Sequence, residues 1–517
     1  MSDSLKNFAA RAWRSEYFFA VFFSLLTLLL HAVCLGQYDY FRDEFYYIAC
    51  SDHLAFGYVD HPPLAMLLLK GVRLLLGDSL AALRLLPMLA AALLVFGAGR
   101  LAKEMGGGRF AVTLGSAAAF SVLGNFFLFH IYSMNFLDHL FWLACFLLLI
   151  RIIKRNQPRL WVFFGLLAGL GLQNKTSVLF LLFGVAVAVL LLPELRALLR
   201  TPWPWLGGAL AALIFLPYLI WNAAHGWPML EFMRNAAAYK ITALSPAAFL
   251  REQILYNNPV SLLVWAAGLG FFLFSRRGRA FRLFGILYLS IYLLFNVQHA
   301  KSYYLAPAYP ALFAGGAVLW ETWLAKGAGP KLRAPLICLV LVAALVLAPM
   351  MLPILPADRF IRYQSWIGLQ PQSGENHEMG PLPQTFADMF GWREMTAKVA
   401  FIYRDLPDKD KRDCLIFGDN YGIAGAISFF GKKEGLPPVI SGHNNYALWL
   451  PENPSANVMI TVGADPVDLE SVFEEVRQLA ETGHPYAMPY ENRNEICLVR
   501  GLKIPFSELK KLIRHFE

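Results

Sequence analysis

Long apolar segments separated by short polar connections occupy most of the first 355 residues. A helix crosses the roughly 30 Å hydrocarbon core of a bilayer with about 20 residues, and its backbone must be hydrogen-bonded internally because lipid offers no partners. We therefore predict a membrane all-α bundle of about eleven transmembrane helices. They are placed near residues 17–36, 79–99, 110–130, 134–150, 160–174, 176–192, 205–224, 258–275, 281–297, 302–324 and 334–353.

Basic residues indicate the orientation of this bundle. Lys6, Arg11 and Arg14 precede the first span. Every second connection after it is short and basic, as the positive-inside rule predicts for cytoplasmic loops; these connections hold Arg100, Lys103 and Arg109; Arg151, Lys154, Arg155 and Arg159; Arg196 and Arg200; Arg276, Arg277, Arg279 and Arg282; Lys326, Lys331 and Arg333. We expect a cytoplasmic N-terminus. The exported parts are then a loop at 37–78, a loop at 225–257 and the chain after Pro353.

The C-terminal part has a different pattern, and we divide the chain into a membrane domain (1–355) and a soluble α/β domain (356–517). Strand-length apolar runs occur at CLIF (414–417), NVMITV (457–462) and EICLVR (495–500), with a predicted helix at 467–481. The stretch FGDNYGIAG (417–425) is only weakly similar to a glycine-rich nucleotide turn, and an ordinary strand-to-helix turn is the favoured interpretation.

Composition agrees with a membrane protein, with 57% hydrophobic residues, 16% charged residues and a mean hydropathy of +0.48. A net charge of +9 could indicate a nucleic-acid partner, but the basic residues lie between apolar segments, so we expect no nucleic acid. The six cysteines form no CxxC pair. Cys414 and Cys497 fall in strand-like runs and could pair in an oxidising compartment.

Ionisable residues gather near the exported ends of the spans. Asp43 and Glu44 follow the first span, and Asp138 lies at the start of a later one, where burying a carboxylate costs several kcal/mol unless it is paired or faces water. The same ends carry Asp60, His61, His139, Lys175, His225, His299, Lys301, Tyr303 and Tyr304.

Each of these residues also has a structural interpretation. The acids could be solvated loop residues, and the lysines could reach toward lipid headgroups. The histidines could cap helices, and the tyrosines could form an interfacial aromatic belt. Their convergence on one face favours a functional site.

A set of carboxylates and lysines suits glycosyl transfer from a lipid phosphate. A carboxylate can take the proton of an attacking hydroxyl or amine, and a lysine can neutralise the departing phosphate. The expected reaction is an in-line displacement at the anomeric carbon. Partial burial beside Glu44 or Asp138 would raise the pKa of the base and strengthen it.

Five stretches carry a resemblance to a known family: RDEFYY (42–47), HPPL (61–64), LDHLFW (137–142), NKTSVLFLL (174–182) and KSYYLAPAYPAL (301–312). Over about residues 1–355 the chain resembles polyprenyl-phosphate-sugar-dependent glycosyltransferases of the GT-C class. It is most similar to bacterial relatives of the protein O-mannosyltransferases and of the lipid A aminoarabinose transferases. The resemblance implies amphipathic helices in the first exported loop, and the stretch 64–76 fits one such helix.

The resemblance also implies roles for single residues. Asp43 would be the catalytic base, with Glu44 as its neighbour and Asp138 as a second acid. The position before the Pro-Pro turn would hold the donor phosphate; it is a lysine in aminoarabinose transferases but His61 here. Phosphate binding would then fall to protonated His61, or to Lys301 and Tyr304 with Tyr303, while Lys175 would be a further helper.

The resemblance implies a metal only as an option. Some relatives bind a structural divalent ion in this region, and Asp60, His61, His225 and His299 could supply oxygen and nitrogen ligands. We expect catalysis to require no cofactor.

These observations predict an inverting glycosyltransferase in a bacterial inner membrane. It would act as a monomer in the lipid bilayer and move a sugar from a polyprenyl-phosphate donor to an acceptor on the periplasmic face, either a glycolipid such as lipid A or lipopolysaccharide, or a protein. The alternative is a membrane transporter or lipid flippase that uses the buried Asp, His and Lys residues as a substrate path. No internal repeat is visible and the charges cluster at one surface, which favours the enzyme.

Overall fold

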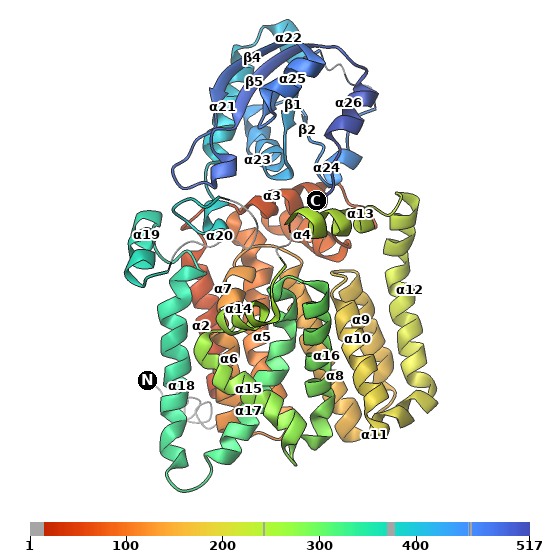
Figure 1. Cartoon of the computed structure of the whole chain (residues 1–517), viewed down its shortest axis with the longest axis vertical. Coiled ribbons are helices and arrows are strands. Elements are labelled where there is room, and N and C mark those ends of the chain that lie inside the picture. The colour runs from red at the N-terminus through yellow and green to blue at the C-terminus, as the bar shows by residue number, and fades with distance from the viewer. Residues whose placement is uncertain (1–14, 241–242, 370–377, 453, 455–456) are drawn as a thin grey trace. The chain divides into compact units, whose positions relative to one another are not determined.

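The computed structural model describes residues 15–240, 243–369, 378–452, 454 and 457–517, so Lys6, Arg11 and Arg14 lie outside the described residues. The chain forms two compact units, each built from separate segments (Figure 1). The first, here called the helical unit, comprises the chain up to Leu35, Arg84–Leu219 and Ala243–Ile354. The second, the sheet unit, comprises Gly36–Leu83, Ile220–Thr242 and Leu355–Glu517.

Each of the predicted membrane segments contains a helix. The apolar helices are α2 (Phe18–Cys34), α5 (Leu80–Glu104), α6 (Arg109–Phe120), α7 (Leu123–Leu128), α8 (Asn135–Arg155), α9 (Leu160–Leu172), α10 (Val178–Leu191), α12 (Pro202–Ala224), α15 (Leu262–Phe274), α16 (Arg282–Gln298), α17 (Tyr309–Trp323) and α18 (Gly329–Leu347). Shorter helical elements join them: α11 (Pro193–Arg196), η1 (Ala197–Arg200), α14 (Pro246–Tyr256), η3 (Pro259–Ser261), η4 (Gly278–Phe281), η5 (Ser302–Ala308) and η6 (Ala348–Met350).

Several of these helices can span a bilayer. Among the described residues, 5 helices are long and apolar enough to cross a membrane, or up to 7 if each of two bent helix pairs counts as one span. Helices α2, α6 and α9 are apolar but shorter. The chain is therefore a multi-pass membrane protein, while the predicted number of eleven spans stays a prediction.

Small residues permit close helix packing in the helical unit. Gly316 of α17 lies against α15, and a Cβ atom at this position would be 1.9 Å from the carbonyl oxygen of Val264. Gly268 of α15 lies equally close to α17, since a Cβ atom added there would be 1.9 Å from the carbonyl oxygen of Leu312. Such contacts are how membrane helices associate without a hydrophobic driving force.

The sheet unit combines helices from distant segments with one mixed sheet. Its helical elements are α3 (Arg42–Asp52), α4 (Leu64–Leu76), α13 (Pro228–Asn235), η2 (Ala236–Lys240), α19 (Ala357–Trp366), α20 (Gln384–Ala387), α21 (Trp392–Asp405), α22 (Asp408–Asp413), α23 (Tyr421–Gly431), η7 (Lys432–Glu434), α24 (Asn445–Leu448), α25 (Pro466–Val472), η8 (Pro489–Glu491) and α26 (Phe506–Ile513). Its strands are β1 (Cys414–Gly418), β2 (Val439–Ile440), β3 (Val458–Val462), β4 (Phe473–Glu481) and β5 (Glu495–Leu502).

The sheet has the strand order β2-β1-β3-β5-β4. Strands β1 and β3 are parallel with Cys414 opposite Val458, and β1 is also parallel to β2. Strand β5 runs antiparallel to β3 and β4. All three predicted strands are present, and the FGDNYGIAG stretch is the turn from β1 into α23, whose N-cap is Asn420.

Two expectations for the sheet unit are corrected. The predicted helix at 467–481 ends at Val472, and Phe473–Glu481 forms β4, because pairing with β5 satisfies its backbone and buries Phe473. Cys414 and Cys497 are both free. They lie on β1 and β5, two strands about 9–10 Å apart across β3, and Cys414 is opposite Val458 whereas Cys497 is opposite Thr461, three residues farther along β3. The two cysteines are therefore too far apart for a disulfide.

The predicted amphipathic element at 64–76 is helix α4, whose bounds match the prediction. It buries Ala65, Met66 and Leu69. Leu74 and Leu75 on its other side are 75% and 84% exposed. A helix with such an apolar exposed face is suited to lie in a membrane interface.

Candidate functional site

The predicted base lies at the start of α3 and is held by the C-terminal part of the chain. The phenol of Tyr421, at the start of α23, donates a hydrogen bond of 2.8 Å to Oδ1 of Asp43. Burial and the Asp43 carboxylate raise the pKa of Tyr421, so the phenol keeps its proton and stays a donor. This hydrogen bond fixes the position of the carboxylate at the start of α3.

Glu44 has a local role that the sequence did not indicate. Its Oε2 accepts a hydrogen bond of 2.9 Å from the backbone N–H of Phe41, the N-cap of α3. Glu44 is 1% exposed. An acid at the third helical position that reaches back to the N-cap backbone fixes the first turn, so Glu44 orients the turn that carries Asp43.

A buried charge cluster surrounds the residue before Asp43. Arg42 Nε lies 3.6 Å from Oε1 of Glu491, and its guanidinium is 4.9 Å from the centre of the Tyr421 ring. Tyr490 donates a hydrogen bond of 3.1 Å to Asp388. Burial raises the pKa of Asp388 to about 7; Arg42 opposes the shift, while Glu491 and Asp43 add to it. Burial also raises the pKa of Glu491, against the influence of Arg42.

Asp60 and His61 lie beside the same helix. Tyr46 of α3 donates a 2.7 Å hydrogen bond to Asp60, and its ring centre is 4.9 Å from that of Tyr421. His61 Nε2 is 3.8 Å from Asp60, and Nδ1 donates to the Pro62 carbonyl oxygen at 2.9 Å. His61 is 0% exposed, so in this structure its ring faces protein rather than solvent.

A second group of predicted residues meets in the helical unit. The ammonium of Lys175 lies 4.0 Å from Oδ2 of buried Asp138 and donates a 2.7 Å hydrogen bond to Asn135. The same ammonium is 5.4 Å from the ring centre of Tyr303 and 5.0 Å from that of Tyr304. A cation beside two phenols at the ends of apolar helices can neutralise a lipid-linked phosphate.

The remaining predicted residues are more scattered. Lys301 is the N-cap of η5, directly before Tyr303 and Tyr304. His299 ends α16 in a left-handed conformation with φ of 50°. His225, in the sheet unit, is exposed; its Nδ1 donates to the Trp221 carbonyl oxygen at 2.8 Å and its ring stacks on Trp221. His225 and His299 thus belong to different units.

Sequence reasoning missed a buried arginine in α5. Arg84 is 0% exposed, and its Nη1 lies 3.1 Å from Nε2 of His130, whose ring stacks on that of His31. The signal was present, because an arginine inside a predicted span is rare and usually functional. Tyr421 and Glu491 were also missed, and here no local signal exists, since each meets the α3 region only through the tertiary fold.

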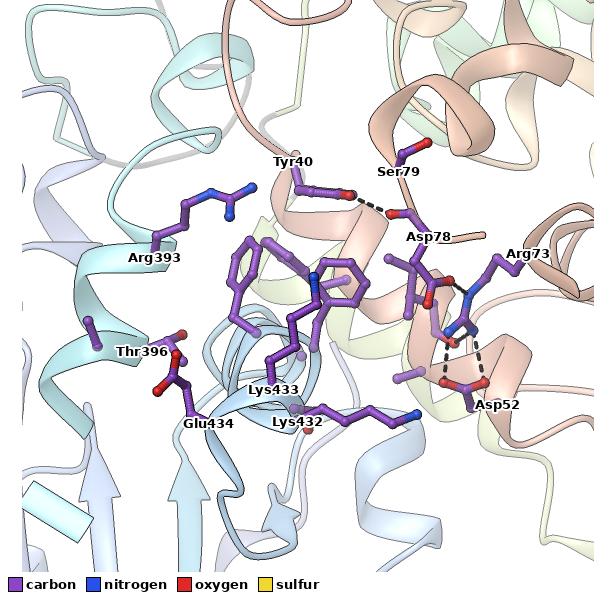
Figure 2. A pocket seen from close by; sticks show the side chains of 18 residues that line it. Tyr40, Asp52, Arg73, Asp78, Ser79, Arg393, Thr396, Lys432, Lys433 and Glu434 are labelled. Atoms are coloured by element: carbon purple, nitrogen blue, oxygen red, sulfur yellow. Dashed lines mark hydrogen bonds and ion pairs between the residues drawn. The ribbon is translucent and has the colours of Figure 1, made fainter. Parts of the chain in front are cut away.

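A cavity of about 640 Å³ opens in the sheet unit between α3, α21 and α23 (Figure 2). Its lining combines the rings of Tyr40, Phe429 and Phe430 with charged side chains. Arg73 forms ion pairs with Asp52 at 2.9 Å and Asp78 at 2.5 Å; the other charged lining residues are Arg393, Lys432, Lys433 and Glu434. Aromatic faces beside cations suit a sugar that carries negative charge.

Metal-binding residue types converge at one place in the part of the chain that the structure describes. His443, His515 and Glu517 form this group, and it contains none of the predicted candidates Asp60, His225 and His299.

Residues 60–221 match the family of dolichyl-phosphate-mannose-protein mannosyltransferases. No curated protein sequence matches the chain.

Solved structures share the fold over nearly the whole chain. ArnT from Cupriavidus metallidurans in the apo state has a TM-score of 0.60 at 13% identity, with 95% of this chain and 98% of that chain covered. The same protein bound to undecaprenyl phosphate has a TM-score of 0.56 at 12% identity, covering 94% of this chain and 98% of that one. The arabinofuranosyltransferase AftD from Mycobacteria has a TM-score of 0.52 at 15% identity, covering 95% of this chain and 40% of that chain.

Proposed function

We propose that this chain, which belongs to the GT-C class of glycosyltransferases, moves a sugar from a polyprenyl-phosphate carrier to an envelope glycolipid on the periplasmic face of a bacterial inner membrane. The family match and the fold shared with ArnT, which has been crystallised with undecaprenyl phosphate, support a lipid-linked donor. The exposed apolar face of α4 supports a reaction at a membrane surface.

One observation carries the donor assignment. Asp138 of α8 and Tyr303 and Tyr304 of η5 meet around the ammonium group of Lys175, which lies in the turn between α9 and α10. Burying a carboxylate and an ammonium among apolar helices carries a desolvation free energy of several kcal/mol. Apolar side chains at these positions would pack the helices without this desolvation penalty, so a structural role alone does not explain the charges. We infer that this cluster binds the donor phosphate and stabilises the anion that leaves in the reaction.

In the proposed reaction, Asp43 takes the proton of an acceptor hydroxyl as its oxygen forms a bond to the anomeric carbon. The bond from that carbon to the phosphate oxygen breaks, and polyprenyl phosphate leaves with the electron pair. Lys175 neutralises the departing phosphate, assisted by Tyr303, Tyr304 and Lys301. Attack opposite the leaving group inverts the anomeric centre. Tyr421 and Glu44 hold Asp43 in place.

The cavity in the sheet unit is the proposed acceptor site. Its volume of about 640 Å³ suits a saccharide headgroup. Lys432 and Lys433 provide positive charge beside Phe429 and Phe430, so the fitting acceptor is a phosphorylated or carboxylated glycolipid rather than a neutral one.

Donor turnover by purified protein tests the proposal. The wild type should transfer label from one of a panel of polyprenyl-phosphate sugars to a glycolipid extract in detergent. Asp43→Asn should abolish transfer, whereas the control Asp468→Asn, at an exposed position on α25, should retain it. Turnover by Asp43→Asn would refute the base assignment.

The competing function predicts another result. A flippase would move a polyprenyl-phosphate sugar between the two faces of sealed vesicles without cleaving it. Intact, relocated donor in wild-type vesicles, with no sugar transferred in detergent, would replace the enzyme proposal with the transporter.

A further inference from the structure

Two histidines and a glutamate converge where the last residues of the chain meet the end of β2. His443, His515 and Glu517 each offer one donor atom, and these atoms all lie within 4.8 Å of one another. His443 is 3% exposed, and the other two are half-buried. The ring centres of the two histidines are 4.4 Å apart.

The backbone brings these side chains together by a short parallel bridge between His443 and His515. The N–H of His515 donates to the carbonyl oxygen of Gly442 at 3.0 Å. The N–H of Asn444 donates to the carbonyl oxygen of His515 at 2.9 Å. Gly442 is required for this approach, because a Cβ there would lie 1.8 Å from the carbonyl oxygen of Ile513. The juxtaposition is therefore built into the fold.

Hydrogen bonds orient both imidazole rings. Nδ1 of His515 lies 2.8 Å from the carbonyl oxygen of Ile513, which can only accept, so in the neutral ring Nε2 presents its lone pair. Nε2 of His443 lies 3.1 Å from the main-chain oxygen of Glu517, which leaves the lone pair of that neutral ring on Nδ1. Fixing one ring nitrogen through a carbonyl oxygen is how metal-binding histidines are held.

The position within the sheet is also typical of a ligand site. His443 follows the carboxyl end of β2, beside β1, and both strands are parallel to β3. Ligands of such sheets bind outside the carboxyl ends of the parallel strands.

We propose that His443, His515 and Glu517 bind a Zn²⁺ ion. Two imidazole nitrogens and a carboxylate oxygen suit zinc, whereas Ca²⁺ and Mg²⁺ prefer oxygen ligands alone. Ligand atoms that surround zinc tetrahedrally at about 2.1 Å lie about 3.4 Å from one another. The donor atoms of this group lie within 4.8 Å of one another, so side-chain rotations that shorten these distances by up to about 1.4 Å complete the site. A water molecule takes the fourth position.

The ion would join the loop after β2 to residues 513–517 and fix the surroundings of Tyr421. The ring centre of Tyr421 is 4.7 Å from that of His443, and its phenol holds Asp43. Zinc would act here as a structural tie, since binding energy at such a site stabilises the folded arrangement. This inference does not depend on the glycosyltransferase proposal.

Metal binding by the full-length protein tests it. The protein is purified in detergent, stripped with EDTA, passed through a desalting column and titrated with ZnCl₂ in competition with a chromophoric chelator. We expect one zinc per chain and a rise in the thermal unfolding midpoint. The double variant His443→Asn/His515→Asn should lose at least 100-fold in affinity, while His53→Asn, at an exposed histidine outside the group, should bind as the wild type does.

Spectroscopy separates a lost ligand from a misfolded variant. Co²⁺ in the wild-type site should give the visible absorption of a four-coordinate centre with nitrogen and oxygen ligands. Glu517→Gln should shift these bands while the variant elutes as the wild type does in size exclusion. Failure of the stripped wild type to bind zinc, or unchanged binding by the double variant, would overturn the proposal. Bound zinc in a protein that transfers no sugar would leave this inference standing and refute only the proposed function.

Discussion

The phenol of Tyr421 donates a 2.8 Å hydrogen bond to the Asp43 carboxylate across 378 positions of sequence. The contact joins the first turn of α3 to the first turn of α23, and Gly425 of α23 lies so near Phe45 of α3 that an added Cβ would be 2.8 Å from the Phe45 Cβ. The C-terminal domain is thus part of the structure that positions the proposed base.

Removal of this hydrogen bond should impair catalysis more than folding. Tyr421→Phe deletes a donor to a charged acceptor, a bond worth about 1.5–3 kcal/mol, so we expect turnover to fall about 10- to 100-fold with the ring packing kept. Turnover of labelled donor and the thermal midpoint measure the two effects. Tyr403→Phe, which removes only a long 3.4 Å contact to a carbonyl oxygen, is the matched control and should be near wild type.

Glu44 should tolerate an amide but not truncation. Glutamine can accept the N–H of Phe41 as glutamate does, so Glu44→Gln should keep turnover within about threefold. Glu44→Ala loses the cap and should cost about 1 kcal/mol of stability together with turnover. Circular dichroism melts and donor turnover check both variants. An inactive but stable Glu44→Gln would show that the negative charge itself acts in the reaction.

Lys175 and Asp138 should be energetically coupled. Lys175→Met leaves the buried Asp138 carboxylate without its ion partner, which should destabilise the protein by about 3–5 kcal/mol. The double variant Lys175→Met/Asp138→Asn should regain most of this stability but remain inactive, because the phosphate site lacks its cation. A double-mutant cycle on thermal midpoints and turnover measures the coupling. Additive losses of stability would contradict it.

Asp388 should make stability fall as the pH rises. Its folded pKa of about 7 exceeds the roughly 3.9 of an unfolded aspartate, so the folded state holds a proton that the unfolded state loses. This contribution to stability is complete below about pH 4, is lost progressively up to about pH 7 and then stays constant. Asp388→Asn removes it, so between pH 5 and pH 8 the stability of the variant relative to wild type should rise by about 3 kcal/mol. Thermal midpoints at both pH values test this, with Asp468→Asn as a variant whose difference from wild type should not change.

The cavity lysines should control acceptor binding only. Lys432→Glu/Lys433→Glu reverses two charges in the lining of the cavity and should raise the KM for an anionic glycolipid about 10-fold or more, without changing the KM for the donor. Steady-state kinetics with each substrate varied in turn measure this. Lys409→Glu/Lys411→Glu on α22 applies the same charge change away from the cavity lining and should leave both values unchanged.

The local pattern of the chain predicted its regular elements well. Every predicted membrane segment contains a helix, because a backbone among apolar side chains in lipid has no other way to satisfy its hydrogen bonds. The strands at 414–418, 458–462 and 495–502 were visible as short β-branched runs between turns. The segment 473–481 was not, since its strand form depends on pairing with β5.

The residue types of the candidate site were also readable, because Asp138 and Lys175 stand out wherever charge is expensive to bury. The residues that contact them in the folded protein could not be predicted from the sequence. The sequence by itself determined which segments are apolar and which ionisable residues lie within or beside them, since hydropathy and backbone hydrogen bonding act locally. Only the tertiary structure decided that Tyr421 holds Asp43 and that His443 meets His515, because these contacts join residues through packing that no local pattern encodes.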